Sequence, residues 1–110
     1  MQRILEDFAY RPLFLSMSVG VLTLHLQVPG CTSLKEKRSR IKPLLFRLRR
    51  EFNVSTAEIG RQDQWQEAVI ACALVSSDNR QTQRSLQKVL AWVEHSWPDL
   101  TVIDEQFEIF

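Results

Sequence analysis

The spacing of apolar residues switches between two periods along this chain, in an order that few folds accommodate. Alternation of apolar and polar residues is typical of a half-buried strand, and repetition every three or four residues is typical of an amphipathic helix. The predicted elements are a strand at 19–28, a helix at 34–52, strands at 54–59 and 68–75, a helix at 80–95 and a strand at 101–109. The predicted order is therefore β-α-β-β-α-β.

This order predicts an α+β fold of the ferredoxin-like type, a β-α-β-β-α-β sandwich in which two helices cover one face of a four-stranded antiparallel sheet. A chain of 110 residues, 45% of them hydrophobic, suits one globular domain. We expect residues 17–110 to form that domain. Residues 1–16 mix charged and aromatic side chains without a clear period, so we expect an N-terminal extension there.

The first predicted helix has a clear start and one internal irregularity. Ser33 and Glu36 have the spacing of a capping box, with Ser33 as the N-cap residue. Pro43 lies well inside the helix and removes one backbone hydrogen bond, which predicts a kink.

Residues 68–75, the third predicted strand, are apolar on both faces. Whichever face meets the helices, the other is left open beside Val21 and Thr23 of the first strand. A large contiguous apolar patch is unusual on a monomer. We therefore expect a homo-oligomer, a dimer or higher, formed through the open sheet face. In the alternative, the N-terminal extension folds over this face with its large apolar side chains, Phe8, Tyr10, Leu13 and Phe14.

The formal charge of +1 conceals an uneven distribution. Residues 35–50 hold eight basic residues and one acidic residue, and the rest of the chain holds six basic and twelve acidic residues. One flank of the predicted helix carries Lys35, Arg38, Lys42 and Arg49. Such a row can neutralise several phosphates of RNA or DNA. The alternatives are a solvated face that pairs with the acidic residues of this or a neighbouring subunit, and contact with a membrane surface.

Two more residues join this candidate phosphate site. Ser33 stands at the helix N-terminus, where backbone N–H groups favour anions. Lys37 falls on the apolar side of the helix. Its ammonium either reaches past the helix end to water or is held, partly buried, by a carboxylate.

The connection after the second strand is polar and also contains a large aromatic residue. Gln62, Asp63 and Trp65 are the candidate partner contacts in this loop. In the alternative, Trp65 packs back over the end of the hairpin.

Several kinds of site are missing from the sequence. Cys31 and Cys72 have no metal-ligand spacing, and with only two histidines no Ser/His/Asp or Cys/His constellation assembles. The chain has no GxxG loop, no phosphate-binding glycine loop and no aromatic residue in the predicted central strands. We therefore expect no catalytic residues, no metal and no cofactor, and no small-molecule ligand is implied.

The cysteine usage and the apolar segments bear on location. Two isolated cysteines fit a reduced, cytoplasmic protein. The apolar run at 13–26 is too short to span a bilayer, and the acidic Glu6 and Asp7 do not fit the start of a signal peptide. We expect no membrane partner.

Four stretches carry a family resemblance: 19–24 (Val-Gly-Val-Leu-Thr-Leu), 33–38 (Ser-Leu-Lys-Glu-Lys-Arg), 52–58 (Phe-Asn-Val-Ser, then Ala-Glu) and 62–66 (Gln-Asp, then Trp-Gln). Together they resemble the YlxP-like bacterial family, a domain of unknown function, over residues 17–110. The resemblance implies the ferredoxin-like fold and no assigned enzymatic activity. Genes of this family often lie among those for transcription termination, translation initiation and ribosome maturation, which implies an RNA- or ribosome-linked role. The extension and Pro43 depart from the family pattern.

These features predict a small, non-enzymatic cytoplasmic protein with an RNA- or ribosome-associated role through its basic first helix. The alternative is a homo-oligomeric protein-interaction module without affinity for nucleic acid.

Overall fold

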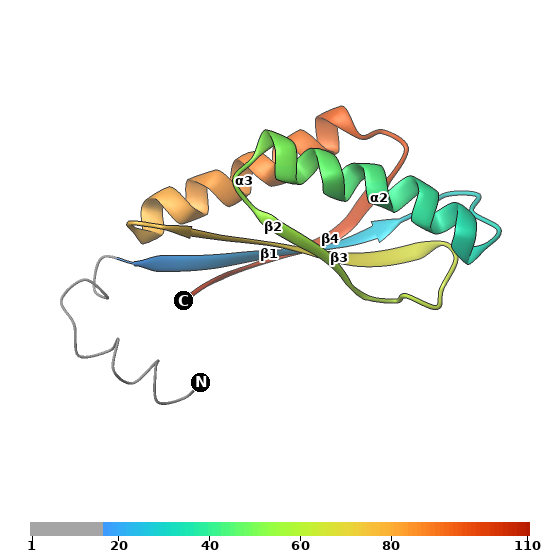
Figure 1. Ribbon diagram of the computed structural model, residues 1–110, viewed down its shortest axis with the longest axis horizontal. Coiled ribbons are helices and arrows are strands. Elements are labelled where there is room, and N and C mark those ends of the chain that lie inside the picture. Colours follow the sequence, from blue (N-terminus) through green and yellow to red (C-terminus); the bar gives the residue numbers. More distant parts are fainter. Residues whose placement is uncertain (1–16) are drawn as a thin grey trace.

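The computed structural model describes residues 17–110, so the predicted extension at 1–16 lies outside the described residues. The elements are β1 (Ser18–Gln27), α2 (Leu34–Glu51), β2 (Ser55–Gly60), β3 (Glu67–Ser76), α3 (Asn79–Ser96) and β4 (Thr101–Ile109). Figure 1 shows both helices on one face of a twisted sheet, with the opposite face left uncovered by helices.

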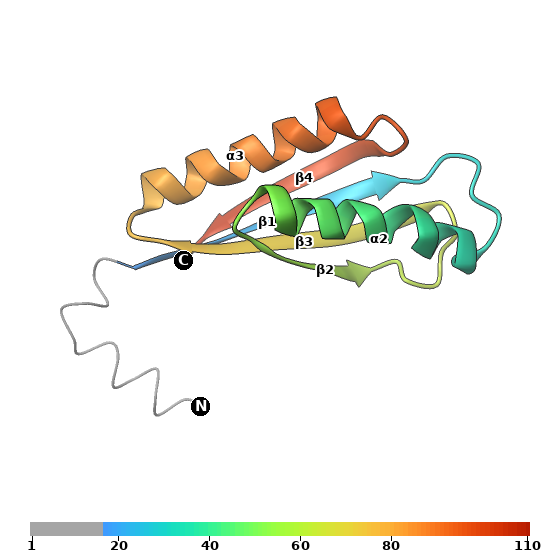
Figure 2. The same ribbon diagram turned by 45° about the horizontal axis from the view of Figure 1, so that its top comes forward.

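The four strands form one antiparallel sheet in the order β2-β3-β1-β4. Helix α2 lies against β2, and α3 lies over β1, β3 and β4. The turned view in Figure 2 shows the two helices side by side, each running roughly along the strands. This order and layering confirm the predicted ferredoxin-like fold.

The alternation in the two central strands separates a core face from an open face. On the core face, alternate residues of β1 and β3 are buried against apolar residues of both helices. The core consists of Leu22, Leu24, Leu26, Val28, Cys31, Ile41, Leu44, Leu48, Ala68, Ile70, Cys72, Leu74, Leu86, Val89, Val93 and Leu100. The open face therefore receives the other residues of β3: Val69, Ala71, Ala73 and Val75.

Helix α3 comes unusually close to β1 because β1 has no side chain at Gly20. A Cβ atom placed at Gly20 would collide with Thr82 Cγ2. The buried Thr82 hydroxyl donates to Ser18 Oγ at 2.8 Å and also contacts Ser76 Oγ. These hydroxyl groups satisfy one another where the helix and the two strands meet.

The last strand departs from the predicted alternation. Sequence spacing places Ile103 on the same face as Phe107, but the register of β1 and β4 shifts between His25 and Leu26. This bulge pairs Val102 with Leu26, and Val102 packs against the core while Ile103 is 48% exposed. One extra residue in a strand reverses the faces of the residues beyond it, which an alternation pattern does not reveal.

Candidate functional site

Helix α2 begins as its sequence predicts. The Ser33 hydroxyl accepts a hydrogen bond from the Glu36 backbone N–H at 3.0 Å, as an N-cap residue does. The helix then continues without a break through Pro43 to Glu51. The basic residues on both sides of Pro43 therefore belong to one helix.

On the sheet-facing side of α2, the ammonium group of Lys37 is buried. Its side chain is 1% exposed and donates to the carbonyl oxygens of Arg61 at 2.7 Å and Glu67 at 3.0 Å. The Glu58 carboxylate lies 3.0 Å away as an ion-pair partner. That contact lacks hydrogen-bond alignment, since Glu58 Oε2 has no hydrogen-bond partner within residues 17–110. Of the two alternatives for Lys37, the structure shows the one in which a carboxylate holds a buried lysine.

On the side of α2 that faces α3, the basic residues are also engaged within the molecule. Arg40 pairs with Asp99 at 3.0 Å and donates to the backbone oxygen of Pro29. Arg47 pairs with Glu51 at 3.2 Å, and its guanidinium lies 5.8 Å from the centre of the Trp92 ring. These two arginines hold α2 in place beside α3.

The remaining basic residues of α2 lie on its exposed surface. Arg49 reaches the edge strand β2, where its guanidinium donates to Thr56 Oγ1 at 2.7 Å. Among residues 17–110, no carboxylate pairs with any residue of this set. We call the set the basic flank: Lys35, Arg38, Lys42, Arg49 and Arg50, all exposed. The structure thus brings together four of the predicted phosphate-binding residues and separates Lys37 from them.

An exposed aromatic residue, Phe46, lies within the basic flank and is not among the residues predicted from the sequence. Phe46 follows Lys42 by one helical turn and precedes Arg50 by another, and it is 55% exposed. The sequence contains a sign of this exposure, because Phe46 does not fall on the predicted apolar stripe of the helix.

The loop between β2 and β3 is fastened at both ends. Lys37 bridges the carbonyl oxygens of Arg61 and Glu67, which flank the loop. Gln66 accepts from the Val28 backbone N–H at 2.8 Å and donates to the Cys31 oxygen at 3.3 Å. Figure 2 shows this loop at the same end of the molecule as the first turn of α2.

All three predicted contact residues of this loop are exposed, namely Gln62, Asp63 and Trp65. Gln62 donates to the Glu58 backbone oxygen, so it also helps to shape the turn. Trp65 is 53% exposed, so about half of its surface remains available to a partner.

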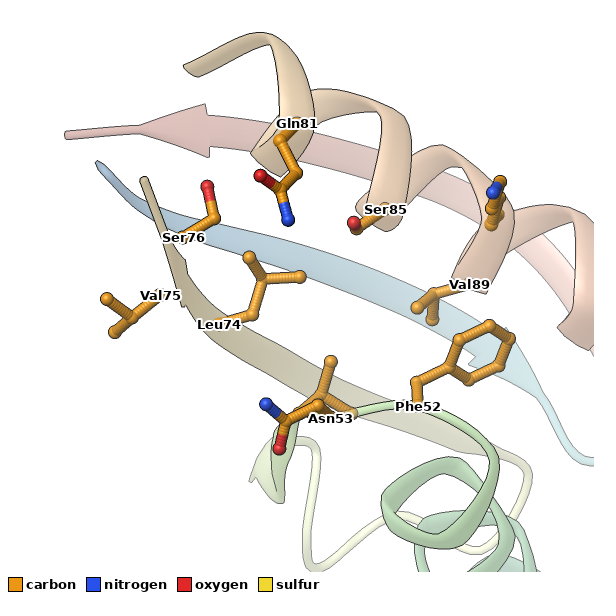
Figure 3. Close-up of a pocket in the computed structure, with 10 residues that line it drawn as sticks. Phe52, Asn53, Leu74, Val75, Ser76, Gln81, Ser85 and Val89 are labelled. Atoms are coloured by element: carbon orange, nitrogen blue, oxygen red, sulfur yellow. The ribbon is translucent and has the colours of Figure 1, made fainter. Parts of the chain in front are cut away.

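A hollow lies between the start of α3 and the end of α2. Figure 3 shows Phe52, Leu74 and Val89 at its base, with the polar side chains of Asn53 and Gln81 at its rim. Its volume is about 160 Å³. Pockets for small ligands are larger, roughly 300–1,000 Å³. This hollow therefore offers no basis for a ligand site.

The cysteines of the chain are both free and buried. Burial raises the pKa of the Cys72 thiol to about 11, so the thiol stays protonated and weakly nucleophilic at neutral pH. Residues 17–110 contain no group of three or more His, Cys, Asp or Glu side chains that could hold a metal ion. No helix within the same residues is long and apolar enough to cross a membrane.

The sequence profile of a family described as "Protein of unknown function (DUF503)" matches residues 19–107, from the first strand to the last. The chain belongs to this family. A curated relative of the DUF503 domain is the "Uncharacterized protein YlxP" of Bacillus subtilis (strain 168). It is 48% identical over 68 residues, which cover 62% of this chain and 73% of the relative.

Two solved structures match this DUF503 domain at low sequence identity. The de novo designed protein Foldit4 is 16% identical with a TM-score of 0.50, and the match covers 86% of this chain and 96% of that one. A dimeric ferredoxin-like protein of unknown function from Thermobifida fusca YX is 14% identical with a TM-score of 0.46, covering 86% and 91%.

Proposed function

We propose that this protein binds RNA, alone or within the ribosome, through the basic flank of α2. The observation that carries the proposal is the division of the basic residues of α2 into two groups. Lys37, Arg40 and Arg47 are held by carboxylates of the same molecule, whereas the basic flank faces solvent without a carboxylate partner among residues 17–110.

The spacing of the flank suits a phosphate backbone. Lys35 and Arg49 are fourteen residues apart, which corresponds to roughly 21 Å along the helix axis. Several phosphates fit along that length, and each one neutralised releases a condensed counterion. The proposal places the protein in the cytoplasm and assigns it no catalytic step.

The acidic residues also favour this use of α2. Asp104 and Glu108 lie on the open face of β4, at the sheet edge farthest from β2. They have no basic partner among the described residues. An RNA strand would be repelled at the β4 edge and attracted to the α2 side, so the charge distribution orients the contact.

Charge-matched variants test the proposal. Lys35→Gln, Arg38→Gln and Lys42→Gln together remove three charges of the basic flank, and Arg80→Gln, Arg84→Gln and Lys88→Gln remove three exposed charges of α3. RNA binding should weaken by about tenfold or more in the α2 variant and change little in the α3 variant. Circular dichroism should report the native fold in both. Equal loss of affinity in the two variants would mean that only net charge matters and would contradict the proposal.

A second candidate function is a homo-oligomeric interaction module that uses the open sheet face. Its centre carries small apolar side chains, with Val21 opposite Ala73 and Val19 opposite Val75. Four strands about 4.8 Å apart and up to about 33 Å long present roughly 600 Å². A pair of copies would bury roughly 1,200 Å², the lower end of the range for stable interfaces. A second copy suits this face because the apolar centre meets itself while the acidic row of β4 stays at the rim.

Sedimentation equilibrium tests this second candidate. The wild-type protein should sediment as a dimer or higher oligomer, and Ala73→Glu should convert it to a monomer. A wild-type monomer at micromolar concentration would contradict the oligomeric candidate and would leave the RNA proposal untouched.

A further inference from the structure

Phe46 is placed in a way that the core does not explain. It is 55% exposed, although the apolar stripe of α2 faces the sheet. In the helix it lies one turn after Lys42 and one turn before Arg50, within the basic flank. A large aromatic side chain in water is unfavourable unless a partner covers it. A flat ring bordered by cations provides a surface on which a nucleobase can stack while the cations contact its phosphates.

Trp65 is a second exposed aromatic residue, in the loop that Lys37 ties to the first turns of α2. Its loop is held against α2 by the Lys37 ammonium and against the segment before α2 by Gln66. Trp65 nevertheless remains 53% exposed. Because the loop is fastened at both ends, ordering it costs little when a partner binds.

The Trp65 loop contacts α2 through Lys37 near the start of the helix, whereas Phe46 lies in its second half. Lys35 and Arg38 are closest in sequence to Lys37, which holds the Trp65 loop, whereas Phe46 is about 16 Å further along the helix than Lys35. At one phosphate per roughly 3.4 Å of stacked strand, the whole flank spans about six nucleotides.

We infer that the ligand of the basic flank is a single-stranded segment of RNA, with one base stacked on Phe46 and another on Trp65. The inference rests on the proposed function and adds the form of the nucleic acid. In a duplex the base faces are covered by neighbouring pairs, and the deep major groove of A-form RNA excludes side chains. A duplex would leave both rings without a partner, so the two exposed aromatics favour an unpaired strand.

The test compares an oligo(A) strand of about twelve nucleotides with an RNA duplex of the same length. The single strand should bind more tightly than the duplex. Phe46→Ala and Trp65→Ala should each weaken single-strand binding by about tenfold while changing duplex binding little. Phe110→Ala is the matched control, because Phe110 is 70% exposed but follows β4, outside the basic flank. It should bind like the wild-type protein.

Tryptophan fluorescence gives a second readout of stacking. Oligo(A) should quench the emission of the wild-type protein, and Trp65→Phe should remove the Trp65 part of that quenching while retaining affinity, since a phenyl ring still stacks. Trp92 and Trp97 are partly buried against the core and serve as the internal reference.

The results distinguish failure of the single-strand inference from failure of the proposed RNA binding. Equal binding of strand and duplex, with wild-type affinity in Phe46→Ala and Trp65→Ala, would overturn the single-strand inference and leave phosphate binding in place. If neither RNA binds in a salt-dependent manner, both the inference and the proposed function fail.

Discussion

Lys37 holds its ammonium group where water cannot reach it, and its three oxygen contacts come from two neighbouring strands and their loop. The buried charge is therefore tolerated because carbonyl oxygens and a carboxylate surround it. The sequence placed Lys37 on the apolar side of the helix but left its partner open, since no spacing rule links it to a residue 21 positions away in another strand. The three-dimensional structure supplies Glu58 as that partner.

Replacement of Lys37 should destabilise the fold strongly. Lys37→Met leaves the Glu58 carboxylate and two loop carbonyl oxygens without their cation, which should lower the free energy of unfolding by about 3–5 kcal/mol. Urea denaturation measures the change, and Lys37→Met combined with Glu58→Gln should recover part of the loss. An unchanged denaturation midpoint in the single variant would contradict this account of Lys37.

The second residue-scale prediction concerns Gly20. Gly20→Ala should lower the free energy of unfolding by about 1–3 kcal/mol, because its methyl group collides with Thr82 and Leu86 of α3. Thr82→Ser removes the colliding methyl group and keeps the hydroxyl that bonds to Ser18. The double variant should therefore be more stable than Gly20→Ala alone. If Thr82→Ser gives no recovery in thermal unfolding, close packing at Gly20 is not the cause.

At the scale of elements, two sides of α2 pack against the sheet and α3, and the third side, which carries the basic flank, is exposed to a partner. The spacing of its basic residues predicted that Lys35, Arg38, Lys42 and Arg49 share a flank, and the helix brings them there because its period of about 3.6 residues determines which residues share a side. The contacts of Arg40 with Asp99 and of Arg47 with Trp92 were not predictable in this way, because both partners belong to the second half of the chain. Tertiary contacts therefore decide which cations remain available.

Pro43 is the one residue of α2 that opposes the helix. Pro43→Ala restores a backbone hydrogen bond to the Ser39 carbonyl oxygen at an exposed position, so it should stabilise the protein by up to about 3 kcal/mol. A higher thermal midpoint with unchanged RNA affinity is the expected result. A lower midpoint would mean that the helix depends on the proline ring.

At the scale of the whole molecule, the strand and helix order was readable from sequence because each element has a clear hydrophobic period. The sequence did not predict which face of β3 stays open, because both faces of this strand are apolar. Packing resolves it: Cys72 and Leu74 meet the helices, and Ala73 and Val75 remain outside. The bulge in β4 escaped prediction for a related reason, because pairing between strands determines it and not the alternation within one strand.

Within the near-neutral total charge, two groups of opposite sign lie apart in the structure. Helix α2, which carries the basic flank, packs against β2 at one edge of the sheet, and the carboxylates of Asp104, Glu105 and Glu108 lie on β4 at the other edge. An anionic partner attracts the basic flank and repels the carboxylates of β4. This steering favours encounters in which the flank faces the partner.

The salt dependence of RNA binding tests the central claim most directly. The dissociation constant of the wild-type protein for a single-stranded RNA is measured between about 50 and about 200 mM salt. Contacts with four or five phosphates predict a log–log slope of magnitude about 3, which weakens binding by roughly 50-fold over that range. The variant lacking Lys35, Arg38 and Lys42 should show a slope near 1. Affinity that stays constant across the salt range would contradict phosphate binding by α2.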